Sequence, residues 1–371
     1  MTDSIILGRV FGIRIGINWS WLVIAVLIVW TLAGAVFPST NPDLSSGTHL
    51  AMGIVAALLF FACILLHELG HAVQARRERV EIEGITLWML GGVAKMTGRA
   101  PGPGAELRIA IAGPLVSLAL GLAFVAVAAW LGLPEAADAV AAWLGYVNLA
   151  LLVFNLVPAF PLDGGRILLA SLALLSGDPE RATRRAVAVS RVASFAMIGV
   201  GAALLLAGDV TSGIWLAFIG WFLLQAAGAE AGQRRAEARL AGVRVRDLMS
   251  PDPVVVRPEM TLSDVVDQVA WRARYTTYPV VEDGAPVGLL PFKALASVPR
   301  SEWETRHVAD SMLPLSRVPV LRPDTPVVEV LSEVGGSEMR RALVVEDGRL
   351  RGILSIVDLL RALEIGGPDR R

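Results

Sequence analysis

The chain has 371 residues, of which 54% are hydrophobic and 18% are charged, and its mean hydropathy is +0.60. This composition is too apolar for an ordinary soluble protein and is typical of a polytopic membrane protein with a soluble part attached. The formal net charge of −1 gives no indication of a nucleic-acid partner, and the single cysteine, Cys63, excludes an internal disulfide.

Three long tracts contain neither Lys nor Arg, at residues 15–75, 109–165 and 192–233. Each tract is long enough for two membrane-spanning helices of about 20 residues and a short outer loop. Arginines gather instead in the segments between these tracts and beyond the last one. The sequence therefore predicts six spans, and the positive-inside rule places both termini and the arginine-rich segments in the cytosol.

The stretch CILLHELGHAVQARR, residues 63–77, places two histidines and a glutamate inside an apolar run. Ionisable groups are costly in such a helix and usually have a function there. His67 and His71 are four residues apart, so in a helix both imidazoles lie on one face and can reach one metal ion. In H-E-x-x-H hydrolases the glutamate, here Glu68, is the base that activates water. Two packing histidines are the alternative, but they leave the buried glutamate unexplained.

A catalytic zinc site needs three protein ligands, so a third must lie elsewhere in the chain. His49 lies at the opposite end of the same predicted helix and His307 in the soluble part, which favours a carboxylate. Asp163, in NLVPAFPLDGGR at the end of the fourth span, is the candidate, because two prolines break the helix there and free backbone to line a polar cavity. Gly164 and Gly165 permit close approach of another backbone segment or the metal. An aspartate that only caps the next helix is the alternative.

The positions of the first arginines after these residues predict that the two halves of the site lie at similar depth. His71 comes shortly before Arg76, about 8 Å along a helix, and Asp163 comes shortly before Arg166. Both halves are therefore expected just inside the cytosolic face of the membrane.

After residue 230 the chain becomes charged, and then soluble and repetitive. The segment YPVVEDGAPVGLLPFKAL is similar to a later one, ALVVEDGRLRGILSIVDLL. Gly288 corresponds to Gly352, which gives a repeat of about 64 residues. Each repeat is expected to contain a helix, a short strand, a helix, two strands joined by an EDG hairpin turn, and a last helix.

Residues 245–371 closely resemble a CBS-domain pair, with a first repeat at 245–298 and a second at 308–363. Some members of that family bind adenine nucleotides through a Ser or Thr three residues before an Asp. Ser355 and Asp358 match this pattern, whereas the first repeat has PFKA at 291–294 and lacks both groups. The resemblance thus implies at most half of a nucleotide site, and a pair that serves only for packing or homodimerisation is the alternative.

The HELGH stretch together with N-x-x-P-x-x-P-L-D-G-G resembles the site-2 protease family of intramembrane zinc metalloproteases, one branch of which carries C-terminal CBS domains. GGVAKM (91–96) and AGPLVS (112–117) also resemble segments of this family. The resemblance implies one Zn²⁺ ion per chain, bound by His67, His71 and Asp163, with Glu68 as catalytic base. It also implies that Asn155 supports the substrate carbonyl or oxyanion, although an inter-helix hydrogen bond accounts for this residue equally well.

The expected fold is a polytopic α-helical membrane protein, with six transmembrane helices and a small membrane-associated β-sheet, followed by a soluble α/β CBS pair. We expect a protease core at 1–229, a helical linker at 230–244 and the CBS pair at 245–371. The sheet is expected because VFGIRIGI and VEIEGITLWML both alternate like edge strands. Such strands pair with an extended substrate or serve only for packing.

These features predict an intramembrane zinc metalloprotease in a prokaryotic plasma membrane, with both termini and the CBS pair cytosolic. Its expected substrate is a single-span regulator, such as an anti-sigma factor or a membrane-tethered transcription factor, and the CBS pair is expected to modulate cleavage in response to a nucleotide. A CBS-regulated transporter and a non-catalytic membrane scaffold are the alternatives. The transporter is disfavoured because the helix breaks lie near one face and complete a hydrolase site, and the scaffold because Glu68 is intact.

Overall fold

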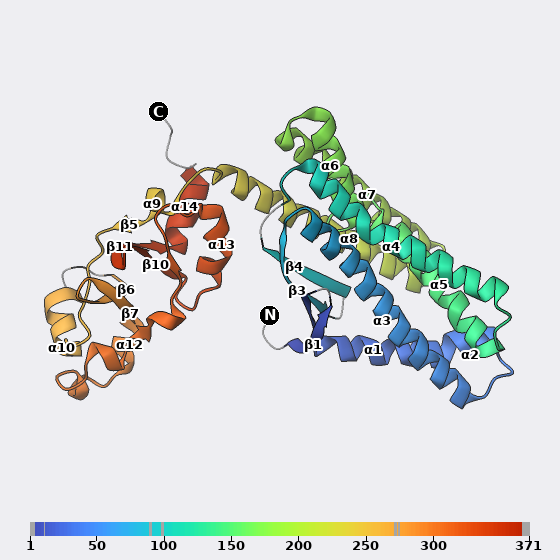
Figure 1. The fold of residues 1–371 in the computed structure, drawn as a ribbon, viewed down its shortest axis with the longest axis horizontal. Coiled ribbons are helices and arrows are strands. Elements are labelled where there is room, and N and C mark those ends of the chain that lie inside the picture. Colours follow the sequence, from blue (N-terminus) through green and yellow to red (C-terminus); the bar gives the residue numbers. More distant parts are fainter. Residues whose placement is uncertain are drawn as a thin grey trace. The chain divides into compact units, whose positions relative to one another are not determined.

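The computed structural model describes residues 4–10, 12–88, 91–97, 100–270, 273 and 275–365 (Figure 1). The chain divides into two compact units, Met1–Gly232 and Gln233–Arg371. This division lies close to the predicted end of the membrane core, and the predicted domain boundaries themselves stay a prediction. The two units are described separately below.

Six helices in the described part of the chain are long and apolar enough to cross a membrane, which confirms the predicted number of spans. The first span, Ser20–Thr40, runs from α1 (Ser20–Thr31) through a π-helical turn into α2 (Phe37–Thr40). The others are formed by α3 (Ser46–Arg77), α4 (Pro103–Trp130), α5 (Glu135–Asn155), α7 (Pro179–Leu206) and α8 (Val210–Arg239). The first unit is therefore a multi-pass membrane domain.

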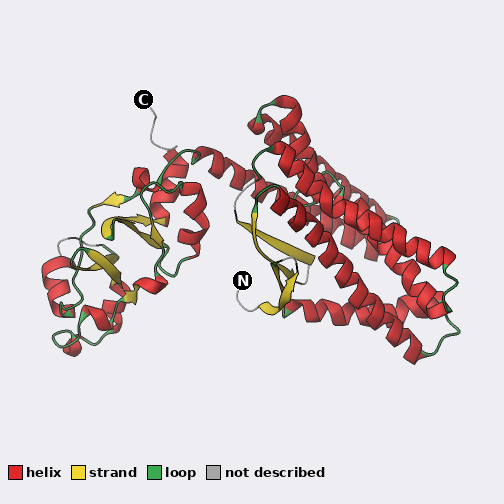
Figure 2. Cartoon of the chain, in the orientation of Figure 1, coloured by secondary structure: helices red, strands yellow, loops and turns green. Residues whose placement is uncertain are grey.

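Helix α3 packs against α1, α4 and α5 within the membrane unit (Figure 2). Small residues permit the closest contacts: a Cβ atom on Gly70 would lie 3.0 Å from the carbonyl oxygen of Ala112 in α4. Large apolar side chains such as Leu122 and Val192 point outward and are more than half exposed. Such a surface is suited to lipid, because the helices satisfy their own backbone hydrogen bonds.

Helix α5 ends at Asn155, before Pro158 and the cis Phe160–Pro161 peptide bond, and the chain becomes helical again in α6 (Asp163–Ser176). The predicted break in the fourth span is thus confirmed. A Cβ atom on Gly164 would collide with the carbonyl oxygen of Leu156, and one on Gly165 with the backbone of Ala159. The two glycines therefore permit the turn between α5 and α6 to fold tightly on itself.

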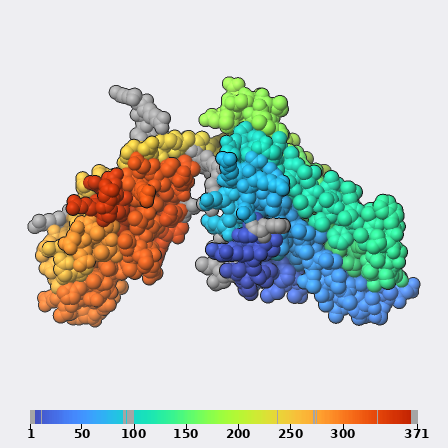
Figure 3. Space-filling model, in the orientation of Figure 1, coloured from blue at the N-terminus to red at the C-terminus, as the bar shows by residue number. Residues whose placement is uncertain are grey.

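A four-stranded sheet belongs to the membrane unit, in the order β1 (Ser4–Val10), β2 (Ile13–Asn18), β3 (Glu81–Trp88), β4 (Gly91–Thr97). Strands β2 and β3 are parallel and the outer pairs are antiparallel. Figure 3 shows the N-terminal strands, in dark blue, against the light-blue segment that follows α3. Ile13 and Ile85 are buried against Leu69 and Ala72, so the sheet packs on the part of α3 that carries the HELGH stretch.

The sheet confirms the predicted strands but corrects their position. VFGIRIGI contributes β2 and VEIEGITLWML contributes β3, and these are the two interior strands, while β1 and β4 form the edges. Ile85 and Leu87 are buried in an interior strand. Alternating hydrophobicity cannot distinguish an edge strand from an interior strand. It shows that one face of the strand is buried, but not whether neighbouring strands bind its backbone on one side or on both.

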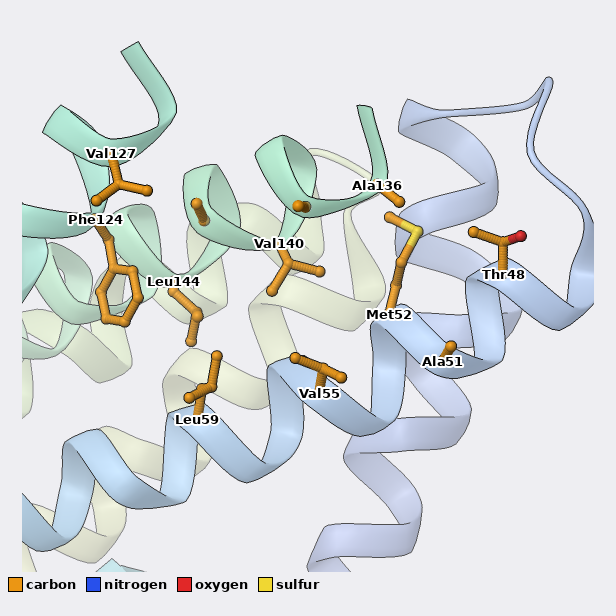
Figure 4. Close-up of a pocket in the computed structure, with 12 residues that line it drawn as sticks. Thr48, Ala51, Met52, Val55, Leu59, Phe124, Val127, Ala136, Val140 and Leu144 are labelled. Atoms are coloured by element: carbon orange, nitrogen blue, oxygen red, sulfur yellow. The ribbon is translucent and has the colours of Figure 1, made fainter. Parts of the chain in front are cut away.

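An apolar cavity of about 370 Å³ lies between α3, α4 and α5 (Figure 4). Its twelve lining residues include Met52, Phe124 and Leu144, and Thr48 is the one polar residue among them. The cavity lies near the Ser46 end of α3, away from the histidines of the HELGH stretch. It is therefore separate from the candidate site described below.

The second unit contains two similar repeats. The first has α9 (Val245–Leu248), β5 (Ser250–Pro251), α10 (Leu262–Asp264) with a π-helical extension to Ala270, β6 (Thr277–Glu282), β7 (Ala285–Pro291) and α12 (Phe292–Ser297). The second has β8 (Leu313–Pro314), β9 (Val320–Leu321), α13 (Val327–Gly336), β10 (Arg341–Glu346), β11 (Arg349–Ser355) and α14 (Ile356–Ile365). The predicted EDG hairpins are present, with left-handed backbone at Asp283, Gly284, Asp347 and Gly348.

The two repeats exchange short strands. Strand β5, from the start of the first repeat, pairs with β11 in a sheet of order β5-β11-β10-β9, and β8, from the start of the second repeat, completes the sheet β6-β7-β8. Each sheet therefore contains residues from both repeats. This makes the pair one folding unit rather than two independent domains.

Candidate active site

Helix α3 positions both histidines of the HELGH stretch. It is 32 residues long, and its N-cap Ser45 accepts a hydrogen bond from the Thr48 N–H. His67 and His71 lie one turn apart on its buried face, with 8% and 7% of their surfaces exposed. His49 lies about 27 Å away along the helix and contacts the carbonyl oxygen of Asn41. As predicted, it is not close enough to be a ligand.

The structure brings Asp163 to the two histidines. Its Oδ2 lies 3.2 Å from Nε2 of His67 and its Oδ1 lies 3.2 Å from Nε2 of His71. Asp163 is the first residue of α6, whose N-cap is Leu162, so it does not cap the helix as the alternative supposed. The N-terminus of a helix also favours a negative charge. The break at the end of α5 thus places the carboxylate of Asp163 next to the buried face of α3.

The spacing of these donors fits a tetrahedral zinc ion. The two Nε2 atoms are 3.2 Å apart, the same as each imidazole–carboxylate distance, and the group as a whole lies within 4.8 Å. Two ligands placed about 2.0–2.1 Å from a tetrahedral zinc lie about 3.3–3.4 Å apart. The donor set, two imidazoles and one carboxylate, is also one that catalytic zinc sites use.

Hydrogen bonding on the far side of the rings supports the same fit. Nδ1 of His71 lies 2.7 Å from the carbonyl oxygen of Ile109, which can only accept, so this nitrogen carries the proton. In the neutral ring Nε2 then carries a lone pair, which faces the carboxylate of Asp163. Two acceptors placed in this way suit a cation shared between them.

One stripe of α4 supports both imidazoles. Ile109, Gly113 and Ser117 are spaced four residues apart and face α3. The hydroxyl of Ser117, 2% exposed, lies 2.8 Å from Nδ1 of His67. A Cβ atom on Gly113 would collide with Nε2 of both His67 and His71, so only glycine leaves room here. No motif in the sequence predicted a role for Ser117, although its hydroxyl is the one Ser or Thr side chain in α4 and lies on the same helix face as Gly113.

Glu68 is half-buried next to the three donors, and within the described residues its carboxylate has no hydrogen-bond or ion-pair partner. Strand β4 passes directly over it, because a Cβ atom on Gly92 would collide with Cγ of Glu68. The carboxylate therefore lies between the metal-binding group and an edge strand of the sheet. That is where a base for hydrolysis of an extended peptide is needed.

The remaining predicted residues lie outside this group. Asn155 is the half-buried last residue of α5, and its side chain has no hydrogen-bond partner among the described residues, so neither account of it is tested. Ser355 and Asp358 lie in the other unit. There Oδ2 of Asp358 accepts hydrogen bonds from the backbone N–H and hydroxyl of Ser355, at the start of α14.

Two family models match the chain. Residues 55–136 and 133–199 match the model of peptidase family M50, and residues 245–300 and 308–365 match the CBS domain. The zinc metalloprotease Rip3 of Mycobacterium tuberculosis is 39% identical over 370 residues, covering 98% of this chain and 94% of that protein. The chain belongs to peptidase family M50, the site-2 proteases. It is a multi-pass zinc metalloprotease with a C-terminal CBS pair, and its substrates are membrane proteins.

Two further relatives of this site-2 protease come from one archaeon, Methanocaldococcus jannaschii. The zinc metalloprotease MJ0392 is 33% identical over 365 residues, covering 98% of this chain and 97% of that protein. A solved site-2 protease is 32% identical, covers 62% of this chain and 95% of that chain, and superimposes with a TM-score of 0.40.

Proposed function

We propose that His67, His71 and Asp163 bind the catalytic zinc of this site-2 protease and that Glu68 is its general base. The observation that carries the assignment is the set of equal 3.2 Å separations among the three donors. Together with this site we propose the domain boundaries given by the sequence: a protease core at 1–229, a linker at 230–244 and the CBS pair at 245–371.

The proposed mechanism is hydrolysis of a peptide bond next to β4. The zinc, when bound, would polarise the scissile carbonyl and lower the pKa of water. Glu68 accepts the proton of the attacking water and passes it to the leaving amide nitrogen. Ser117 and the carbonyl of Ile109 hold the two imidazoles in orientation during this transfer. For Asn155 we propose a hydrogen bond to the substrate carbonyl.

We propose that β4 is the strand that receives the substrate. It is an edge strand, and Gly92 places its backbone against Glu68. An extended substrate added to this edge would present its peptide bonds to the base. The substrate we propose is a single-span regulatory protein, such as an anti-sigma factor, whose helix must unwind locally to reach the site.

Proline substitution tests this pairing. In an edge strand, every second residue directs its backbone N–H to the free edge and the others direct theirs to the neighbouring strand. Val93 and Ala94 are adjacent, so proline at one of them (the outward variant) removes a donor that faces the free edge, and proline at the other removes a donor that faces β3. We expect the outward variant to lose cleavage while keeping zinc. Ile85→Pro and Leu87→Pro, in the interior strand β3, serve as comparison because they break the sheet itself. Normal cleavage by both β4 variants would contradict the pairing.

We also propose that the site opens to the cytosol. Arg76 and Arg77 end α3, and Arg166 lies in the first turn of α6, so the metal-binding group lies at the arginine-rich end of both helices. The positive-inside rule assigns that end, both termini and the CBS pair to the cytosolic side of a prokaryotic plasma membrane. Water would enter from there.

For the CBS pair we propose regulation of cleavage by an adenine nucleotide bound near Ser355 and Asp358. The observation that favours it is the position of both side chains at the N-terminus of α14, where an anionic ligand is stabilised. Asp358→Ala is expected to weaken nucleotide binding measured by calorimetry. If the CBS pair binds no ATP, ADP or AMP, its role is packing or homodimerisation. Sedimentation would then distinguish these two roles, because only the second gives a dimer.

Zinc content and cleavage of a single-span model substrate, measured together in detergent, test the site. Glu68→Ala should keep zinc and lose cleavage, because the base is removed but the ligands remain. Asp163→Ala should lose both, whereas Asp138→Ala, in the first turn of α5, should lose neither. Retention of zinc by Asp163→Ala, or cleavage by Glu68→Ala, would overturn the assignment.

A further inference from the structure

Strand β1 exposes large apolar side chains on both of its faces. Ile5, Ile6 and Leu7 follow one another and are 61–66% exposed. Ile5 and Ile6 project to opposite faces, because side chains alternate along a strand. In Figure 3 the N-terminal strands, in dark blue, lie on the surface of the membrane unit. A strand with one face in water would carry polar residues on that face, so this pattern favours apolar surroundings for β1.

Two arginines face each other next to these apolar residues. Arg9 of β1 and Arg14 of β2 are directly paired in the antiparallel ladder, so their side chains project from the same face of the sheet. Both are exposed, and in the part of the chain that the structure describes no carboxylate lies within ion-pair distance of either guanidinium. Like charges placed directly opposite each other destabilise a sheet. An anion bound between the two arginines would therefore stabilise the hairpin.

The two arginines lie on the face of the sheet that is turned away from α3. Ile13, the residue before Arg14, is 1% exposed and packs on α3. Because successive side chains alternate, Arg14 points away from α3, and its partner Arg9 does the same. Ile6 is paired with Gly16, two residues after Arg14, and therefore lies on this outer face as well. One face of the hairpin thus combines two guanidinium groups with an exposed apolar side chain.

The start of the first span places the hairpin at the boundary between lipid headgroups and hydrocarbon. Strand β2 ends at Asn18 and the span begins at Ser20, so only Trp19 lies between them, and its side chain is 67% exposed. Tryptophan is enriched at this boundary. The free edge of β1 also requires it, because unpaired backbone groups find no partners in hydrocarbon, whereas water and headgroups supply them.

A polar cavity of about 430 Å³ lies beside the turn of the hairpin. Its lining includes Gly12 in the turn, Arg76 and Arg79 at the end of α3, and one acidic residue, Glu81. A Cβ atom on Gly12 would lie 3.6 Å from a guanidinium nitrogen of Arg76. The volume lies within the range of small-ligand pockets. Cationic groups are therefore present at the turn of the hairpin as well as on its outer face.

We propose that the β1–β2 hairpin binds anionic lipid: the apolar side chains of β1 enter the outermost hydrocarbon, and Arg9 and Arg14 bind the headgroup phosphates. A guanidinium matches phosphate in charge and in its paired donors, and an anionic membrane surface attracts arginines next to a span. Strands β2 and β3 connect the hairpin to β4. The lipid surface thereby fixes the depth at which β4 lies over Glu68.

A depth measurement on the full-length chain in nanodiscs tests this proposal. In a Cys63→Ala background, a fluorescent thiol probe at Ile6→Cys is quenched by a nitroxide carried on the lipid chains just below the headgroups. The discs contain either phosphatidylcholine alone or phosphatidylcholine with phosphatidylglycerol. Because the anionic surface attracts both arginines, we expect quenching to be about two-fold stronger in the discs with phosphatidylglycerol. The same probe at Val320→Cys, an exposed apolar position in the CBS unit, should show almost none.

Substitution of the arginines tests their part in the effect. Arg9→Gln with Arg14→Gln should make quenching equal in the two kinds of disc, whereas lysine at both positions keeps the charge and should keep most of the difference. Arg181→Gln with Arg184→Gln is the matched control. It also removes two positive charges from an arginine-rich segment, but each of these arginines is already paired with a carboxylate. The control should keep the full difference between the lipids.

Quenching at Ile6→Cys no stronger than at Val320→Cys would overturn the insertion of β1. Equal quenching in the two kinds of disc with both arginines present would overturn headgroup recognition, and this comparison decides even where a glutamine variant does not fold. Loss of the difference on addition of inorganic phosphate at constant ionic strength would identify a free anion as the ligand and overturn the lipid proposal. None of these results affects the protease assignment, because that rests on zinc content and cleavage.

Discussion

The hydrogen bond between Ser117 and His67 gives a quantitative prediction for zinc affinity. Ser117→Ala removes the hydroxyl that lies 2.8 Å from Nδ1 of His67, and no other described residue contacts this nitrogen. Ser117 is 2% exposed, so water does not easily replace the lost partner of Nδ1. The imidazole is then free to rotate or to change tautomer, and Nε2 no longer faces the metal.

The size of the effect follows from the cost of an unsatisfied buried polar group, about 1–3 kcal/mol. This corresponds to roughly 5- to 150-fold in an equilibrium constant, and it agrees with the roughly 10- to 100-fold loss of metal affinity seen when the partner of a ligating histidine is removed. We therefore expect Ser117→Ala to bind zinc about 10- to 100-fold more weakly, and kcat/KM to recover when zinc is added in excess.

Competition with a chelator of known zinc affinity, in detergent, measures this change. Ser194→Ala is the matched control, because Ser194 is also fully buried in a spanning helix but donates only to the carbonyl of Ser190 in its own helix. Unchanged zinc affinity of Ser117→Ala would refute the reasoning. An equal loss in Ser194→Ala would attribute the effect to general destabilisation of the bundle.

Three further predictions follow from contacts in the structure. Gly113→Ala should abolish zinc binding, measured as metal content, because its Cβ would occupy the space of the two imidazole Nε2 atoms. Gly92→Ala should keep zinc but lower kcat several-fold, because its Cβ would displace Glu68. In the CBS unit, the hydroxyl of Thr261 lowers the pKa of Asp264, so Thr261→Ala should raise that pKa in a carbon-13 NMR titration. Because the folded-state pKa is depressed, the stabilisation by Asp264 is present above its ordinary pKa and is lost as the pH falls through the lowered one.

Gly199→Ala is the control for both glycine substitutions. Gly199 lies within α7, and a Cβ atom there would meet nothing within 4 Å. Alanine in a helix interior is more favourable than glycine, so this variant should keep zinc and cleave normally. A loss of zinc in Gly199→Ala would mean that steric exclusion at Gly113 is not the cause of the expected effect. An unchanged pKa of Asp264 in Thr261→Ala would likewise contradict the hydrogen-bond explanation.

The sequence alone was sufficient for the features that depend on short-range spacing. His67 and His71 face the same way because a helix repeats nearly every four residues, and the six spans follow from the length of the Lys- and Arg-free tracts. Asp163 could be proposed because few residue types bind zinc and a helix break at membrane depth is rare. Each of these inferences uses a period, a length or a ligand preference that holds without knowledge of the fold.

Tertiary structure alone decided which distant segments meet. Ser117 and Ile109 contact the imidazoles, and Gly92 lies over Glu68, because α4 and β4 pack on α3, and nothing within those segments specifies that contact. The same applies to the interior position of β3 and to the exchange of β5 and β8 between the CBS repeats. Local patterns record how each segment buries one face, whereas the choice of partner is made by the packing of all segments at once.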